Sequence, residues 1–174
     1  DFSIVKGGLE VYPRLVAAEH RLPFPSGQLS SGVEAIDQLL GGGLDCGTSA
    51  LLMGPAGSGK SSLALQYAVA AAERGEHAIV YTFDESLTTM VARMAGLGVD
   101  LQPHIESEHI HVQPIDPGER SPGEFVHRLR REIEQFNSKV VVIDSLNGYL
   151  SAMPEERFLI IQLHELLTYL GQQG

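Results

Sequence analysis

Apolar residues recur along the chain in two alternating patterns, short continuous runs and helical periodicities. The continuous runs predict strands at 49–53, 78–83, 109–115 and 139–144. The helical periodicities predict helices at 33–40, 60–74, 86–97, 122–136 and 154–172. Strands that alternate with helices in this way are typical of an α/β fold with a mostly parallel sheet and helices on both of its faces.

The first 20 residues follow a different pattern. Two short β-prone runs, at 2–5 and 9–12, flank Lys6-Gly7-Gly8, and together they predict a β-hairpin. Residues 21–32 contain two prolines and two glycines, a composition typical of a linker. A lone hairpin is only marginally stable in water, so we expect it to pack against this domain or against a neighbouring one.

Composition narrows the classes of protein that fit. The 174 residues include 12 Lys and Arg against 22 Asp and Glu, a net charge of −10, which disfavours binding to nucleic acid. No apolar run is long enough for a membrane span, and the first residues do not resemble a signal peptide. A single cysteine, Cys46, excludes an internal disulfide and favours a reducing compartment. We therefore expect a cytoplasmic α/β protein.

One motif carries most of the chemical information. The segment Gly54-Pro55-Ala56-Gly57-Ser58-Gly59-Lys60-Ser61 matches the phosphate-loop pattern G-x-x-x-x-G-K-[ST] at every fixed position. Its glycines allow backbone N–H groups to point at phosphate oxygens, and the following helix adds the positive end of its dipole. We expect Lys60 to reach the β- and γ-phosphates and Ser61 to bind Mg²⁺. The predicted nucleotide-binding residues are Gly54, Pro55, Ala56, Gly57, Ser58, Gly59, Lys60, Ser61 and Ser62. The alternative is a glycine-rich turn without a ligand, which the strand predicted before it and the helix predicted after it disfavour.

Two acidic positions follow predicted strands. Asp144 ends the apolar run V-V-V-I-D, and enzymes with a phosphate loop place a magnesium-site carboxylate in this way. Asp84 and Glu85 follow the strand after the loop helix, where a carboxylate can activate a water or a hydroxyl for attack on the γ-phosphate. The longer side chain favours Glu85 as the base. The alternatives are a core strand that ends in a polar residue for Asp144, and helix capping for the acidic pair.

These motifs, in this order and spacing, resemble those of KaiC-type ATPases of the RecA superfamily, and the resemblance covers nearly the whole chain. Residues 30–44, S-S-G-V-E-A-I-D-Q-L-L-G-G-G-L, resemble the family's helix and glycine-rich turn before the first core strand. Y-T-F-D-E-S and V-V-V-I-D-S-L-N resemble its acidic strand ends. The opening, residues 1–15, resembles the segment that closes one KaiC-type domain and leads into the next. The family commonly has two glutamates where this chain has Asp84 and Glu85, which leaves open which carboxylate is the base.

The resemblance implies a fold, a domain arrangement and an activity. The fold is a RecA-like phosphate-loop NTPase. Residues 1–26 would be the tail of a preceding KaiC-type domain with a linker, and 27–174 an ATPase domain that is incomplete at its C-terminus. The family implies binding of ATP with Mg²⁺ between the protomers of a ring, often a hexamer, in which a neighbour's C-terminal strands complete the site. It also implies slow ATP hydrolysis, Ser/Thr autophosphorylation in some domains, and a partner protein in signalling.

Two other functions share the same motifs. A nucleotide-gated scaffold would bind ATP, assemble and signal with negligible turnover. A DNA-strand-exchange protein of the RecA type would use the same site, but the net charge of −10 and the lack of a basic loop with aromatic residues argue against it. ATP rather than GTP follows from the resemblance alone, because a phosphate loop contacts phosphates and not the base.

Overall fold

The computed structural model describes residues 1–174 except 21–22, 25, 117–120 and 152–155. The strands are β1 (Phe2–Val5), β2 (Gly8–Val11), β3 (Gln28–Leu29), β4 (Leu44–Asp45), β5 (Ala78–Thr82), β6 (Ile110–Pro114) and β7 (Val140–Asp144). The α-helices are α1 (Glu34–Leu39), α2 (Lys60–Glu73), α3 (Leu87–Gly96), α4 (Gln102–Glu106), α5 (Pro122–Phe136), α6 (Leu146–Ser151) and α7 (Glu156–Gln173). A short 3₁₀ turn, Ala17–Glu19, lies between the hairpin and β3.

The central sheet has the order β6-β5-β7, and its strands are all parallel. The register places the last residue of β5, Thr82, opposite the last residue of β7, Asp144. Both strands therefore end at the same edge of the sheet. In parallel α/β sheets this edge, at the carboxyl ends of the strands, is where ligands bind.

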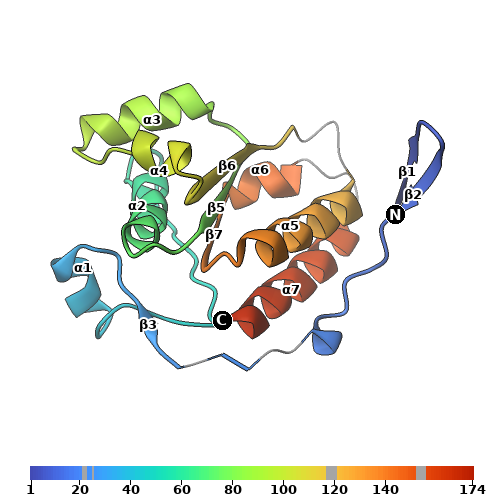
Figure 1. Cartoon of the computed structure of the whole chain (residues 1–174), viewed down its shortest axis with the longest axis horizontal. Coiled ribbons are helices and arrows are strands. Elements are labelled where there is room, and N and C mark those ends of the chain that lie inside the picture. The colour runs from blue at the N-terminus through green and yellow to red at the C-terminus, as the bar shows by residue number, and fades with distance from the viewer. Residues whose placement is uncertain (21–22, 25, 117–120, 152–155) are drawn as a thin grey trace.

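Helices cover the sheet on both faces, as the sequence predicts (Figure 1). β5 is buried along its whole length, so its successive side chains enter two separate cores. Ile79 and Tyr81 contribute to the core that contains α5, α6 and α7, with Phe125, Leu129, Tyr149, Leu166 and Tyr169. Ala78 and Val80 contribute to the core that contains α2 and α3, with Leu65, Ala68, Met90 and Met94.

Most of the predicted elements are confirmed, but the predicted strand at 49–53 is wrong. These residues form no ladder, and Leu51 and Met53 are 66 % and 83 % exposed. An apolar run becomes a strand only when a neighbour pairs with it, and within the described residues β7 pairs with β5 alone. The last helix begins in the structure at Glu156, and the predicted start at Pro154 lies outside the described residues. The patterns gave no sign of β3, β4, α4 and α6, which are all short.

The N-terminal hairpin of β1 and β2 is confirmed, and it stands apart from the two cores (Figure 1). Its register puts four apolar side chains on one face, each between 62 % and 83 % exposed: Phe2, Ile4, Leu9 and Val11. Ser3, on the other face, donates a hydrogen bond from Oγ to Oε2 of Glu124 at the start of α5 (3.3 Å). The polar face of the hairpin therefore lies toward the domain, and the apolar face lies toward solvent.

Candidate nucleotide site

The phosphate loop leads directly into α2, in the place that the motif predicts. Gly59 is the N-cap of α2 with φ 87°, and Gly57 has φ 77°, so both adopt the left-handed conformation that glycine allows. A Cβ at either position would meet no atom within 4 Å, which leaves open space beside the loop. At Gly54 a Cβ would lie 2.7 Å from Oγ of Ser58, so that hydroxyl would have to turn away. The loop therefore combines left-handed backbone with free space, as a phosphate cradle needs.

Lys60 is the first residue of α2, and its side chain folds back over the loop. Its Nζ donates hydrogen bonds to the carbonyl oxygens of Gly54 (2.9 Å) and Pro55 (2.8 Å). Lys60 follows the last glycine of the loop in the sequence. Its side chain nevertheless reaches back, so the ammonium group lies over the segment where phosphates would bind. Ser61 and Ser62 follow on the first turn of α2, where backbone N–H groups lack helical partners.

The acidic pair lies in a turn that the end of β5 holds in place. The Thr82 hydroxyl donates to the backbone oxygen of Glu85 (3.0 Å) and accepts from the backbone N–H of Glu85 (3.3 Å). Thr82 is only 2 % exposed, so this hydroxyl depends on the turn for its hydrogen bonds. The backbone N–H of Phe83 donates to the backbone oxygen of Asp144 (2.9 Å), which joins the turn to the end of β7.

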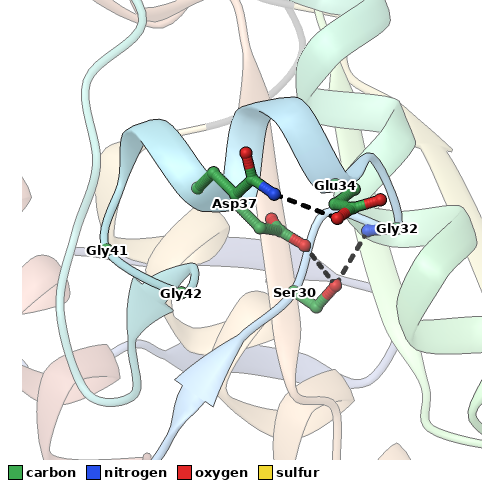
Figure 2. Close-up of a pocket in the computed structure, with 7 residues that line it drawn as sticks. Ser30, Gly32, Glu34, Asp37, Gly41 and Gly42 are labelled. Atoms are coloured by element: carbon green, nitrogen blue, oxygen red, sulfur yellow. Dashed lines mark hydrogen bonds between the residues drawn. The ribbon is translucent and has the colours of Figure 1, made fainter.

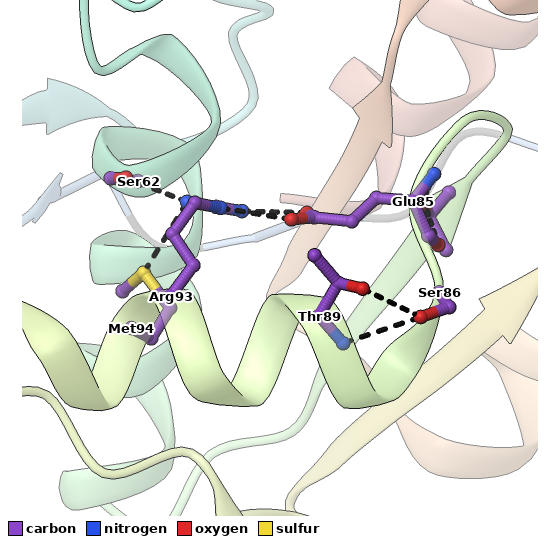
Figure 3. Close-up of polar contacts among 7 residues, drawn as sticks. Ser62, Glu85, Ser86, Thr89, Arg93 and Met94 are labelled. Atoms are coloured by element: carbon purple, nitrogen blue, oxygen red, sulfur yellow. Dashed lines mark hydrogen bonds and ion pairs between the residues drawn. The ribbon is translucent and has the colours of Figure 1, made fainter.

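The two carboxylates of the pair have different surroundings. Asp84 is exposed, and its Oδ2 accepts a hydrogen bond from Oγ of Ser145, the residue after Asp144 (3.0 Å). That hydroxyl in turn accepts from the backbone N–H of Gly148 in α6 (3.0 Å). Glu85 is half-buried and points toward α3 (Figure 3). The structure thus places Asp84 beside the end of β7 and Glu85 between α3 and α2.

Arg93 of α3 is a functional candidate that the sequence analysis missed. Its Nε and Nη2 donate to Oε1 and Oε2 of Glu85 at 3.0 and 2.7 Å, and its Nη1 donates to Oγ of Ser62 at 2.6 Å (Figure 3). The hydrogen bonds to Glu85 raise the pKa of Arg93 above its usual value, and the nearby charge of Asp144 acts in the same direction. The sequence gives no clear signal for this contact, because Glu85 lies before the N-cap of α3 and eight residues exceed the spacing of three or four that joins neighbours on a helix.

The predicted magnesium ligands are Ser61, at the start of α2, and Asp144, half-buried at the end of β7. Within the described parts of the chain, no three His, Cys, Asp or Glu side chains gather closely enough to hold a metal by themselves. Mg²⁺ does not need such a group, because it keeps several waters and takes one or two protein ligands beside the substrate phosphates. A hydroxyl and a carboxylate at these two positions fit that chemistry.

A separate open cleft lies beside α1. Its volume is about 580 Å³, and Figure 2 shows Ser30, Gly32, Glu34 and Asp37 among the residues that line it. Asp37 accepts from the hydroxyls of Ser30 (2.6 Å) and Ser31 (2.7 Å) and from the backbone N–H of Ser31 (2.8 Å), which lowers the pKa of Asp37. No lining residue belongs to the phosphate loop, so Asp37 serves to fix the chain before α1.

Among the described residues, no helix is both long and apolar enough to cross a membrane.

This fold and this site define a RecA-like nucleoside triphosphatase domain of the phosphate-loop class. A family model described as "ATPase: KaiC" matches residues 29–174. The chain therefore belongs to the KaiC family of ATPases, which confirms the resemblance drawn from the motifs.

Curated relatives carry the same family name. The chain is 28 % identical over 156 residues to "Circadian clock protein KaiC3" of Synechocystis sp., an alignment that covers 84 % of this chain and 31 % of the relative. It is 25 % identical over 157 residues to "Circadian clock oscillator protein KaiC" of Picosynechococcus sp., covering 90 % of this chain and 30 % of that relative. The chain thus spans about three-tenths of the length of these relatives.

Proposed function

We propose that this chain binds ATP with Mg²⁺ at the loop of residues 54–62 and hydrolyses its γ-phosphate. The observation that carries the proposal is that two acidic positions lie at one edge of the sheet and are linked to the start of the loop helix. The acidic turn after β5 is joined by backbone to Asp144 at the end of β7, and Arg93 bridges Glu85 to Ser62 on the first turn of α2. Family membership supports ATP as the nucleotide.

Each residue has a distinct role in this proposal. The loop's backbone N–H groups and the first turn of α2 hold the phosphates, and Lys60 exchanges its two carbonyl partners for phosphate oxygens. Ser61 and Asp144 would hold Mg²⁺, which would supply positive charge that offsets the charge of the phosphates. A water attacks the γ-phosphorus as the bond to the β-phosphate oxygen breaks, ADP leaves, and the water's proton passes to a carboxylate of the acidic pair.

The base of the pair is Asp84 in this proposal. Asp84 is exposed and accepts one hydrogen bond in the described part of the chain, whereas both oxygens of Glu85 are engaged by Arg93. The longer side chain of Glu85 remains the argument for the alternative. The variants Asp84→Asn and Glu85→Gln decide between them, since loss of the true base lowers turnover by about a hundredfold or more.

We also propose a place for the chain in a longer protein. Residues 1–26 would be the tail of a preceding KaiC-type domain, and 27–174 part of the ATPase domain. The outward apolar face of the hairpin supports this arrangement, because a neighbouring domain would cover it. The site would lie between copies in a ring, often hexameric, with the protein acting in regulation through autophosphorylation or a partner protein.

The test incubates the full-length protein with Mg²⁺ and γ-labelled ATP, and separates free phosphate from label bound to protein. Release of free phosphate that Lys60→Ala abolishes, with Lys139→Ala unaffected as a matched lysine control, supports hydrolysis at this site. Label bound to protein and lost in the same variant adds autokinase activity. ATP binding and assembly without either product contradicts the proposed hydrolysis and favours the nucleotide-gated scaffold.

A further inference from the structure

Arg93 joins two parts of the proposed site that belong to different elements. Its guanidinium contacts the acidic turn through both oxygens of Glu85, and the first turn of α2 through the hydroxyl of Ser62. Ser62 is the residue after the proposed magnesium ligand Ser61. One side chain from α3 therefore bridges the loop helix and the acidic turn (Figure 3).

The geometry of this bridge differs from that of an ordinary surface ion pair. The guanidinium and carboxylate meet side by side through two hydrogen bonds, and the Arg93 and Glu85 side chains are only 30 % and 21 % exposed. Two parallel hydrogen bonds fix the orientation of both groups as well as the distance between them. Each oxygen of Glu85 thus uses a lone pair to accept from Arg93, whereas Asp84 accepts one hydrogen bond, at Oδ2, in the described part of the chain.

We propose that Arg93 is a positioning residue for ATP hydrolysis: it keeps Glu85 out of the reaction and holds the acidic turn at a fixed place against the first turn of α2. Asp84, whose one hydrogen bond in the described part of the chain comes from Ser145, is then the carboxylate of the pair that faces the nucleotide. This inference rests on the proposed hydrolysis, and it assigns to Arg93 and Ser62 a role that neither the phosphate-loop motif nor the acidic strand ends imply.

Charge supports the same role. Asp144 lies near enough to Arg93 to raise its pKa, and Glu85 is in direct contact, so the guanidinium offsets negative charge at two strand ends. A variant without that charge leaves the negative charges of Glu85 and Asp144 without this offset. The repulsion would displace the turn, and a displacement of about 1 Å can lower turnover by up to a hundredfold.

The experiment is a double-mutant cycle in the full-length protein, with Arg93→Gln, Glu85→Gln and the double variant. Steady-state ATP hydrolysis gives kcat and KM, and binding of a fluorescent ATP analogue gives an affinity that does not depend on turnover. Arg130→Gln is the matched control, since Arg130 forms a 2.8 Å pair with Glu134 on α5 and has no contact with the phosphate loop. Arg93→Lys keeps the charge but removes the paired hydrogen bonds.

We expect each single variant to lower kcat about tenfold with KM and analogue affinity within about twofold, because nucleotide contacts remain. The double variant should also fall only about tenfold, since both changes break the same bridge. Arg93→Lys should fall between wild type and Arg93→Gln, and Arg130→Gln should match wild type.

Three outcomes would overturn the inference. One is a double variant that loses about a hundredfold, which would make the two effects independent. Another is an Arg93→Gln variant indistinguishable from Arg130→Gln, and the third is complete loss of turnover in Glu85→Gln alone, which would make Glu85 the base. Failure of the proposed function has a different signature, because the wild-type protein itself would then release no phosphate.

Discussion

Thr82 is the buried polar residue on which the geometry of the acidic turn depends, and its replacement by valine tests that dependence. Valine keeps the size and β-branching of threonine but cannot form the two hydrogen bonds to the backbone of Glu85. Each bond contributes about 1 kcal/mol net, so their loss costs about 2 kcal/mol. The added methyl returns about 0.8 kcal/mol through burial.

The net loss is therefore about 1 kcal/mol, which in a domain of this size lowers Tm by about 2–4 °C. Stability alone does not identify the role of the hydroxyl, so Thr82→Ser is the matched variant. Serine keeps both hydrogen bonds and loses a buried methyl, at a similar cost of about 0.8 kcal/mol. Both variants should melt slightly below wild type.

Turnover separates the two variants. In Thr82→Val the turn that carries Asp84 and Glu85 is no longer fixed to β5, and we expect kcat for ATP hydrolysis to fall about tenfold. Thr82→Ser should retain kcat within about twofold of wild type. The assay is steady-state phosphate release from the full-length protein at saturating ATP, with thermal melts of the same samples. Equal kcat in the two variants would refute the reasoning, because the hydroxyl would then have no part in placing the carboxylates.

Three further changes test the metal site, the chain before α1 and the core. Asp144→Asn should raise the Mg²⁺ concentration needed for half-maximal hydrolysis about tenfold or more, measured by magnesium titration with ATP saturating. Hydrogen bonds from Ser30 and Ser31 lower the pKa of Asp37 in the folded state. The carboxylate therefore contributes its full stabilisation at any pH above the pKa of Asp37 in the unfolded chain. That stabilisation is lost as the pH falls through the pKa of Asp37 in the folded state. Melts across pH should therefore show Asp37→Asn less stable than wild type at neutral pH, with the difference closing below about pH 4. Leu129→Ala, at a fully buried position of α5, should cost about 2–5 kcal/mol by urea unfolding, whereas Leu39→Ala, 86 % exposed, should stay within about 0.5 kcal/mol.

The sequence predicts most of this fold because its signals are local. Apolar periodicity indicates the long helices and the three strands of the central sheet. Another local signal is the serine before α5, since Oγ of Ser121 caps that helix by accepting from the backbone N–H of Glu124 (3.2 Å). The run at 49–53 shows the limit of this reasoning. Its apolar residues favour a strand, but a strand needs a ladder partner, and local composition does not specify one.

The candidate site likewise has a part that local sequence signals indicate and a part that depends on tertiary packing. The phosphate loop, the acidic pair and Asp144 are recognised from spacing, because each follows or precedes an element at a fixed place. The contact between Arg93 and Ser62 joins residues 31 positions apart and depends on how α3 packs against α2. The outward orientation of the apolar face of the hairpin also depends on tertiary contacts. Alternation predicts that one face is apolar, but only the contact of Ser3 with Glu124 shows which face lies toward the domain.

The acidic turn is joined to Asp144 by backbone contacts but to the first turn of α2 by a side-chain contact. This difference bears on how nucleotide binding at the loop would affect the acidic turn. The acidic turn and Asp144 are fixed to each other by backbone, through the register of β5 with β7 and the hydrogen bond from Phe83 to Asp144. In the described part of the chain, the first turn of α2 reaches that turn by a side-chain hydrogen bond only at Ser62, through Arg93. Phosphates that bind the loop act on this first turn directly. A shift of α2 on ATP binding would therefore act on Glu85 through the guanidinium of Arg93, in addition to the core that α2 shares with β5.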